Sequence, residues 1–93
     1  MDCQSIVFSG HALRRMFERS VQRDAVLHVV RSGESIAEYP DDRPYPSYLL
    51  LGFVAGMPLH VVVARDAGSG RCFVVTVYQP RSDLWSDDFR TRK

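Results

Sequence analysis

The chain has 93 residues, of which 45% are hydrophobic and 25% charged, so we expect one soluble globular domain over residues 1–93. The formal net charge is only +1, which excludes binding to nucleic acid through bulk charge and requires any such site to arise from local clustering. No apolar run approaches the length that crosses a membrane. Lys93 is the only lysine, so the positive charge is almost all arginine, which binds phosphate with bidentate geometry. A GC-rich coding sequence is the alternative explanation for this bias toward arginine.

The first third of the chain predicts a short strand and two helices. Gln4–Phe8 is a β-prone run, and Ser9 is a good N-cap for a helix over Gly10–Arg19. Ser20 is expected to cap a second helix, which ends at Gly33. Two helices joined almost directly form an αα-hairpin.

The remaining chain predicts strands separated by turns and ends in a polar tail. Three prolines within residues 40–46 form a stiff loop, and residues 55–56 and 66–70 form hairpin turns. In the tail, Leu84, Trp85 and Phe89 either pack a short helical turn back onto the body or anchor a partner. The expected strands cover residues 35–39, 48–54, 57–65 and 72–79. The fold class is therefore α+β, with two helices on one face of a mainly antiparallel sheet of about four strands.

The first helix carries a polar and an apolar arc when it is drawn at 100° per residue. The polar arc suits a polyanion because it holds three guanidiniums, and its imidazole supplies proton transfer near neutral pH. A solvated face with a partial Arg14–Glu18 pair is the alternative. The polar arc comprises His11, Arg14, Arg15, Glu18 and Arg19, and the apolar arc, expected to cover the core, comprises Ala12, Leu13, Met16 and Phe17.

Side chains in the last two expected strands alternate between the two faces of the sheet, and each strand contributes one functional polar side chain. His60 shares a face with Val62 and Ala64, whereas Thr76 and Tyr78 share a face opposite Phe73, Val75 and Val77. The alternatives are that His60 is a core histidine whose hydrogen bonds are satisfied, and that Tyr78 is a packing residue at the rim of the sheet. Cleavage of RNA without a metal needs a base, an acid and cations for the phosphorane charge. We therefore expect His11, Arg15, His60 and Tyr78 to form one catalytic site, with His11 and His60 about one substrate's width apart.

No metal or cofactor site is expected. The three histidines lack ligand spacing, and the two cysteines, Cys3 and Cys72, form no CxxC motif. These cysteines could form one disulfide, but the N-terminus shows no basic-then-apolar signal segment, which favours reduced cysteines and a cytoplasmic location.

Residues 11–19, His-Ala-Leu-Arg-Arg-Met-Phe-Glu-Arg, resemble the signature His-Ala-x-x-Arg-Met-x-x-Arg-Gly of a small uncharacterised bacterial domain. Further matches are Glu-Tyr-Pro-Asp-Asp at 38–42, Pro-Leu-His-Val-Val-Val at 58–63, Val-Thr-Val-Tyr at 75–78 and Asp-Asp-Phe-Arg at 87–90. One departure is Ser20, where the pattern has glycine. Members of that domain resemble the RelE, BrnT and MqsR toxins, which share a compact α+β ribonuclease fold.

The resemblance implies the toxin of a type II toxin–antitoxin system, a metal-independent endoribonuclease that cleaves messenger RNA. The implied catalytic residues are His11, Arg15, His60 and Tyr78, and Arg14, Arg19 and Arg81 are expected to bind RNA. The implied partner is an antitoxin of the zinc-ribbon or helix-turn-helix type, whose acidic groups would cover the arginine face of the first helix. The alternative is a non-catalytic protein-binding module of the same fold.

Overall fold

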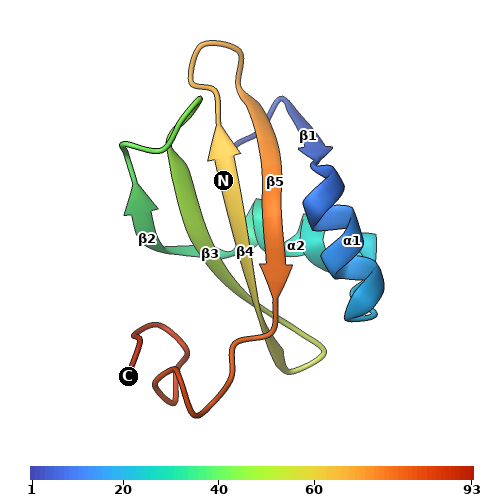
Figure 1. Ribbon diagram of the computed structural model, residues 1–93, viewed down its shortest axis with the longest axis vertical. Coiled ribbons are helices and arrows are strands. Elements are labelled where there is room, and N and C mark those ends of the chain that lie inside the picture. The colour runs from blue at the N-terminus through green and yellow to red at the C-terminus, as the bar shows by residue number, and fades with distance from the viewer.

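The computed structural model describes residues 1–93 and contains two helices and five strands (Figure 1). Helix α2 lies behind a single twisted sheet, α1 lies beside β5, and the chain ends in a segment without regular structure. In chain order the elements are β1 (Ser5–Phe8), α1 (Gly10–Glu18), α2 (Arg23–Ser32), β2 (Glu34–Tyr39), β3 (Ser47–Val54), β4 (Met57–Arg65) and β5 (Arg71–Tyr78).

The sheet has the strand order β1-β5-β4-β3-β2, in which β2 to β5 are antiparallel to their neighbours and β1 runs parallel to β5. The α+β class with two helices is confirmed, but the sheet has five strands and is mixed. The expected sheet of about four strands is wrong because hydrophobic alternation identifies a strand and not its partner. Here β1 pairs with the last strand of the domain, and Ser5 lies opposite Arg71.

Helix α1 lies along the edge of the sheet beside the second half of β5. Ser9 is its N-cap, as expected, because its hydroxyl accepts from the Ala12 N–H at 3.0 Å, and the same hydroxyl donates to the Val75 carbonyl at 3.2 Å. From this edge position only a narrow stripe, Ala12 and Met16, is buried.

The wider apolar arc expected for α1 is wrong. Leu13 is 53% exposed and Phe17 is 88% exposed, so neither contributes to the core. A helix at a sheet edge contacts its neighbour over a smaller arc than a helix that lies across a sheet face. The helical periodicity of the sequence does not reveal this position, so it placed both residues incorrectly.

The junction between the helices also differs from expectation. Ser20 adopts a left-handed conformation with φ of 55°, so it ends α1, and Gln22 precedes α2 without a side-chain cap. Serine therefore occupies the left-handed position that the signature's glycine favours. Gly33 follows α2, as expected, and glycine is needed there because the backbone lies close to the last turn of the helix. A Cβ at this position would lie 2.4 Å from the Val29 carbonyl oxygen.

The main core lies between the helices and one face of the sheet, the helix face. It consists of Ala12, Met16, Val26, Val29, Val30, Leu50, Leu59, Val61, Val63, Cys72, Val74 and Val77. The opposite face, the tail face, carries a second group of buried side chains. It comprises Leu49, Leu51, His60 and Ala64, with Trp85 from residues 79–93, the C-terminal segment, packed against His60.

A bulge in β5 changes which side chains face the C-terminal segment. The pairing shifts from Val62 opposite Thr76 to Val63 opposite Val74, which leaves Val75 as an extra residue. Phe73 therefore pairs with Ala64 and lies on the tail face with Tyr78, and its expected place beside Val77 is wrong.

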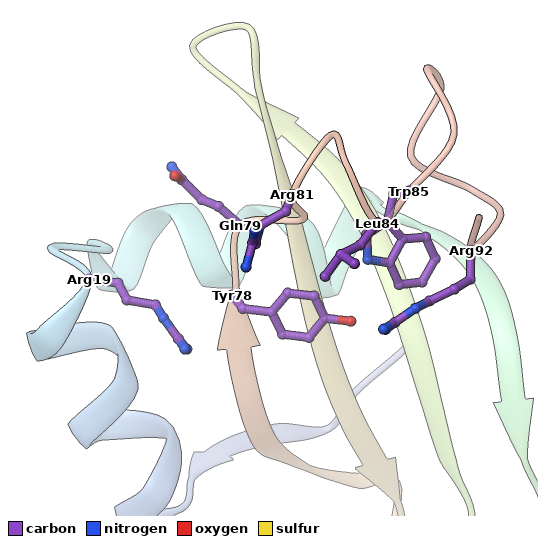
Figure 2. A pocket seen from close by; sticks show the side chains of 7 residues that line it. All are labelled: Arg19, Tyr78, Gln79, Arg81, Leu84, Trp85 and Arg92. Atoms are coloured by element: carbon purple, nitrogen blue, oxygen red, sulfur yellow. The ribbon is translucent and has the colours of Figure 1, made fainter.

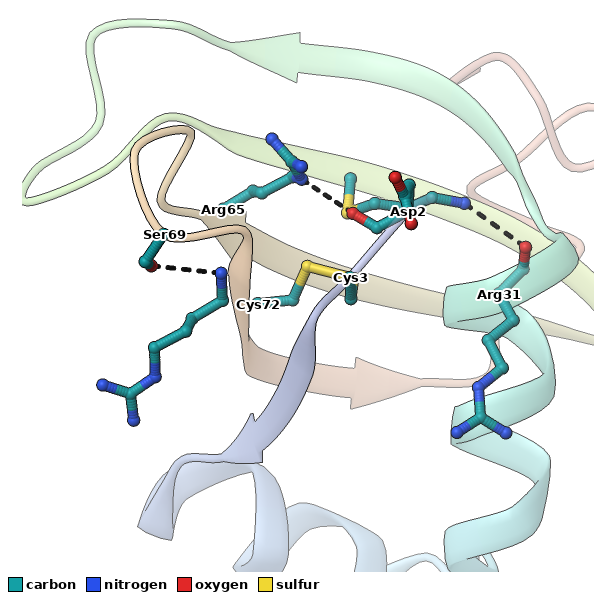
Figure 3. The surroundings of a disulfide bond; sticks show 8 residues. Asp2, Cys3, Arg31, Arg65, Ser69 and Cys72 are labelled. Atoms are coloured by element: carbon teal, nitrogen blue, oxygen red, sulfur yellow. Dashed lines mark hydrogen bonds between the residues drawn. A yellow bond between two sulfur atoms is a disulfide. The ribbon is translucent and has the colours of Figure 1, made fainter.

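A disulfide joins Cys3 to Cys72 and ties the start of the chain to β5 (Figure 3). A side-chain hydrogen bond also holds the N-terminal residues, since Arg65 Nε donates to the Asp2 carbonyl at 2.8 Å. The expectation of reduced cysteines is wrong, because the parallel pairing of β1 with β5 brings the two residues together. No helix has the length and apolar character needed to cross a membrane.

Candidate functional site

The expected partners His60 and Tyr78 lie directly opposite each other on β4 and β5. His60 Nδ1 is 3.2 Å from the Tyr78 hydroxyl, and Nε2 is 2.9 Å from the carbonyl oxygen of Phe89. Because a carbonyl can only accept, Nε2 carries the hydrogen, and Nδ1 then accepts from the Tyr78 hydroxyl. Burial lowers the pKa of His60, partly offset by the bond to Phe89, so the ring is neutral at physiological pH.

The C-terminal segment closes over this pair. Trp85 is buried and meets the His60 ring edge-on, with ring centroids 4.5 Å apart, after a single turn in which its N–H donates to the Arg81 carbonyl at 3.0 Å. Arg90 forms an ion pair with Glu34 of β2 and fastens the far end of the segment. Trp85 therefore folds back on the body and is not an exposed anchor for a partner.

An open pocket of about 530 Å³ lies beside Tyr78 at the end of β5; we call it the arginine pocket. Figure 2 shows guanidiniums on both sides of the phenol ring, Arg19 from the end of α1 and Arg92 from the C-terminal segment. The pocket is lined by Arg19, Tyr78, Gln79, Arg81, Leu84, Trp85 and Arg92.

The three arginines of this pocket differ in how their charge is used. Arg81 binds Asp83 through two hydrogen bonds of 2.7 and 3.1 Å, so its charge is largely neutralised. Arg19 and Arg92 have no carboxylate partner: Arg19 donates to the Val77 carbonyl at 2.9 Å, and the Arg92 guanidinium lies 5.9 Å from the Trp85 ring centroid. The pocket therefore presents two oriented, unneutralised cations.

Burial raises the pKa of the Tyr78 phenol, and nearby Tyr39 raises it further, whereas Arg92 opposes the shift. Tyr78 is therefore protonated at neutral pH, with its proton directed toward His60 Nδ1. The arrangement is a half-buried phenol in the wall of an electropositive pocket, backed by a neutral imidazole. Such a pair can accept a proton from a bound group and pass one inward.

The other expected site residues do not join this pair. His60 has no exposed surface, so it cannot contact a substrate together with His11, and the expected shared site of the two histidines is wrong. His11 lies exposed on the first turn of α1, and Arg15 pairs with Glu18 at 2.9 Å, so the Arg14–Glu18 pair considered as the alternative does not form. His60 is buried and both of its ring nitrogens have hydrogen-bond partners, as the alternative of a satisfied core histidine expects.

Among the residues expected to bind RNA, Arg19 and Arg81 line the arginine pocket, whereas Arg14 does not. Sequence reasoning missed Arg92, because the C-terminal segment has no periodic pattern that would place it. Its one sequence signal is Trp85, a large apolar residue in a polar segment, which indicated a fold-back point. No group of three or more His, Cys, Asp or Glu side chains is placed to hold a metal ion.

A family model described as "Domain of unknown function (DUF4258)" matches residues 8–79, more than three quarters of the chain. The chain belongs to the DUF4258 family. Neither the curated proteins nor the solved structures include a match to it. The DUF4258 match contains His60 and Tyr78 but ends at Gln79, so Trp85 and Arg92 lie outside the matched range. The link to the RelE, BrnT and MqsR toxins stays a prediction.

Proposed function

We propose that the protein binds single-stranded RNA in the arginine pocket and cleaves it without a metal, as the toxin of a toxin–antitoxin pair. The observation that supports this most strongly is the pair of unneutralised guanidiniums, Arg19 and Arg92, on the two sides of the Tyr78 phenol (Figure 2). Arg92 lies on the hydroxyl side of the ring and Arg19 on the opposite side, and two such cations suit a phosphodiester, since arginine binds phosphate with bidentate geometry and stabilises a phosphorane.

The proposed reaction begins at the Tyr78 oxygen. That oxygen accepts the proton of the RNA 2′-hydroxyl while its own proton passes to His60 Nδ1. The 2′-oxygen bonds to phosphorus, the bond to the 5′-oxygen breaks, and Arg19 and Arg92 stabilise the charge on the phosphoryl oxygens. The 5′-oxygen takes a proton from water in the open pocket, and His60 returns its proton to solvent through Tyr78. The products are a 2′,3′-cyclic phosphate and a 5′-hydroxyl.

In this proposal His60 is a positioning residue and a proton acceptor that never touches RNA. Its lowered pKa keeps Nδ1 unprotonated at neutral pH, so the lone pair is free to accept the Tyr78 proton. The Phe89 carbonyl fixes the tautomer by taking the hydrogen of Nε2.

The experiment is cleavage of a fluorescent single-stranded RNA by the purified protein in the presence of EDTA. We expect the wild type to cut, and Arg19→Ala to cut about 10²–10³-fold more slowly, which is the usual cost of losing a transition-state donor. Arg31→Ala is the matched control, since Arg31 is an exposed arginine near the end of α2 that forms no ion pair. Equal rates for the two variants would contradict the assignment of this pocket.

His11→Ala and Arg15→Ala test the site expected from the sequence, in which α1 carries the chemistry. Loss of cleavage in these variants, with Tyr78→Phe fully active, would move the reaction from the arginine pocket to the first two turns of α1. The proposal expects the reverse result.

A non-catalytic protein-binding module is the second candidate, favoured by the exposure of Leu13 and Phe17 on α1. A toxin must also be held inactive, so the proposal includes an antitoxin, of the zinc-ribbon or helix-turn-helix type, encoded by the adjacent gene. Co-expression with that gene followed by size-exclusion chromatography separates the candidates. Intact RNA together with a complex that Phe17→Ser abolishes would favour the binding module.

Messenger RNA as substrate requires the protein to act in the cytoplasm, where thiols are usually reduced. The proposal therefore requires that the fold persist without the Cys3–Cys72 bond. Growth arrest on induction in the cytoplasm, relieved by the adjacent gene, is the corresponding expectation in cells.

A further inference from the structure

We propose that a second hollow, between β2 and the C-terminal segment, binds an unpaired nucleobase next to the phosphate held in the arginine pocket. This inference rests on the proposed function and names the part of the RNA that the same surface recognises. The hollow, which we call the β2 pocket, has a volume of about 540 Å³ and lies on the tail face of the sheet.

The β2 pocket and the arginine pocket are adjacent because they share walls. Tyr78, Trp85 and Arg92 line both of them. Figure 2 shows these three side chains close together, with the phenol of Tyr78 directed toward Arg92. A ligand that bridges the two hollows therefore passes over the Tyr78 hydroxyl and beside an unneutralised guanidinium.

The two pockets differ in chemistry. Six of the nine residues that line the β2 pocket are hydrophobic, among them Ile36 and Leu49, against three of seven in the arginine pocket. The β2 pocket does contain Arg90, but Glu34 neutralises its charge through an ion pair. A phosphate is therefore favoured in the arginine pocket, and a flat, weakly polar group is favoured in the β2 pocket.

An aromatic ring is available for stacking in the β2 pocket. Tyr39, at the end of the edge strand β2, is 41% exposed, so its ring is only partly covered by the chain itself. Every base has a π-face that stacks on such a ring, whatever the sequence. A base inside a duplex cannot enter, so the ligand is a nucleotide of a single strand.

The combination of an anion site and a stacking site across one shared wall matches a nucleotide better than either half alone. A free phosphate would leave the β2 pocket empty. An apolar peptide side chain would make no use of Arg19 and Arg92, whose charges have no carboxylate partner. The linkage of a base to a phosphate through ribose provides both groups at neighbouring positions.

The test is titration of the ¹⁵N-labelled full chain with AMP, adenosine and inorganic phosphate, followed by NMR. We expect AMP to shift the amides of residues 36–39 and 91 as well as those of residues 79–81, and phosphate to shift only the second group. Tyr39→Ala should weaken AMP binding about 10-fold or more and leave phosphate binding unchanged, whereas Tyr39→Phe should bind AMP as the wild type does.

Phe53→Ala is the matched control, because Phe53 is a 51% exposed aromatic residue on β3 that lines neither pocket. It should bind AMP and phosphate normally. Shifts from AMP confined to residues 79–81, no binding of AMP at all, or unchanged AMP affinity in Tyr39→Ala would each overturn the inference.

AMP has no phosphodiester to cleave, so this outcome is independent of catalysis. AMP in the β2 pocket together with intact RNA would refute the ribonuclease and leave the nucleobase site standing. Cleaved RNA with no AMP signal at residues 36–39 would refute only the nucleobase site.

Discussion

Replacing Tyr78 by phenylalanine removes one oxygen and tests the His60–Tyr78 pair directly. The hydroxyl donates to Nδ1 of a histidine that has no exposed surface, so its removal leaves a buried acceptor without its protein partner. A buried acceptor left without a partner costs about 1–3 kcal/mol. For a domain of this size each kcal/mol lowers Tm by roughly 4–8 °C, so we expect Tyr78→Phe to unfold about 5–20 °C below the wild type.

Tyr48→Phe is the matched control for this measurement. Tyr48 is also half-buried, but it packs on the helix face against the main core, and its hydroxyl makes no hydrogen bond within the protein. Its removal should change the free energy of unfolding by no more than about 0.5 kcal/mol. Circular dichroism of the three proteins at pH 7.5 measures the difference.

The same pair of variants tests the chemistry. Below the unfolding transition, Tyr78→Phe should cleave RNA about 10²–10⁴-fold more slowly, the range lost with a general acid or base, and Tyr48→Phe should match the wild type. A Tyr78→Phe protein that melts with the wild type would refute the hydrogen bond to His60. One that cleaves RNA at the wild-type rate would refute the proton relay.

Three further predictions concern the fold. Burial lowers the pKa of His60, so the unfolded chain binds more protons than the folded one below about pH 6.5. Urea titrations should therefore show that the free energy of unfolding decreases as the pH is lowered below this value, by at most about 1.4 kcal/mol per pH unit, and His60→Gln should lose this dependence. Replacing Cys3 and Cys72 by serine should lower the free energy of unfolding by about 4 kcal/mol in the same urea titrations, because the bond closes a loop with a sequence separation of 69. Met16→Ala should cost about 2–5 kcal/mol in the same denaturation assay, whereas exposed Phe17→Ala should cost less than about 0.5.

The local elements were predictable because each depends on neighbouring residues. Alternation identified the strands of the sheet, and Ser9 identified the start of α1 through its hydroxyl. The misplaced features depend on distant contacts. Ser20 is left-handed only because of how α1 meets α2, and Phe17 is exposed only because α1 lies at the sheet edge.

The candidate site shows the same division. Alternation placed His60 and Tyr78 on two neighbouring strands, but their direct pairing also depends on the bulge at Val75, which alternation did not reveal. The Phe89 carbonyl that fixes the His60 tautomer, and Arg92 beside the phenol, come from a segment with neither periodicity nor a strong turn signal. Their positions are set by Trp85 packing on His60, a contact that only the folded structure reveals.

The central claim is that RNA is cleaved by its own 2′-hydroxyl beside Tyr78. The most direct measurement incubates the purified protein, in EDTA, with a single-stranded RNA and with the same RNA carrying a 2′-deoxynucleotide at the cleaved position. The account predicts fragments ending in a 2′,3′-cyclic phosphate and a 5′-hydroxyl from the first RNA, and none at that position from the second. An RNA that stays intact in both samples, or a deoxy position that is cut as fast as the ribose, would contradict it.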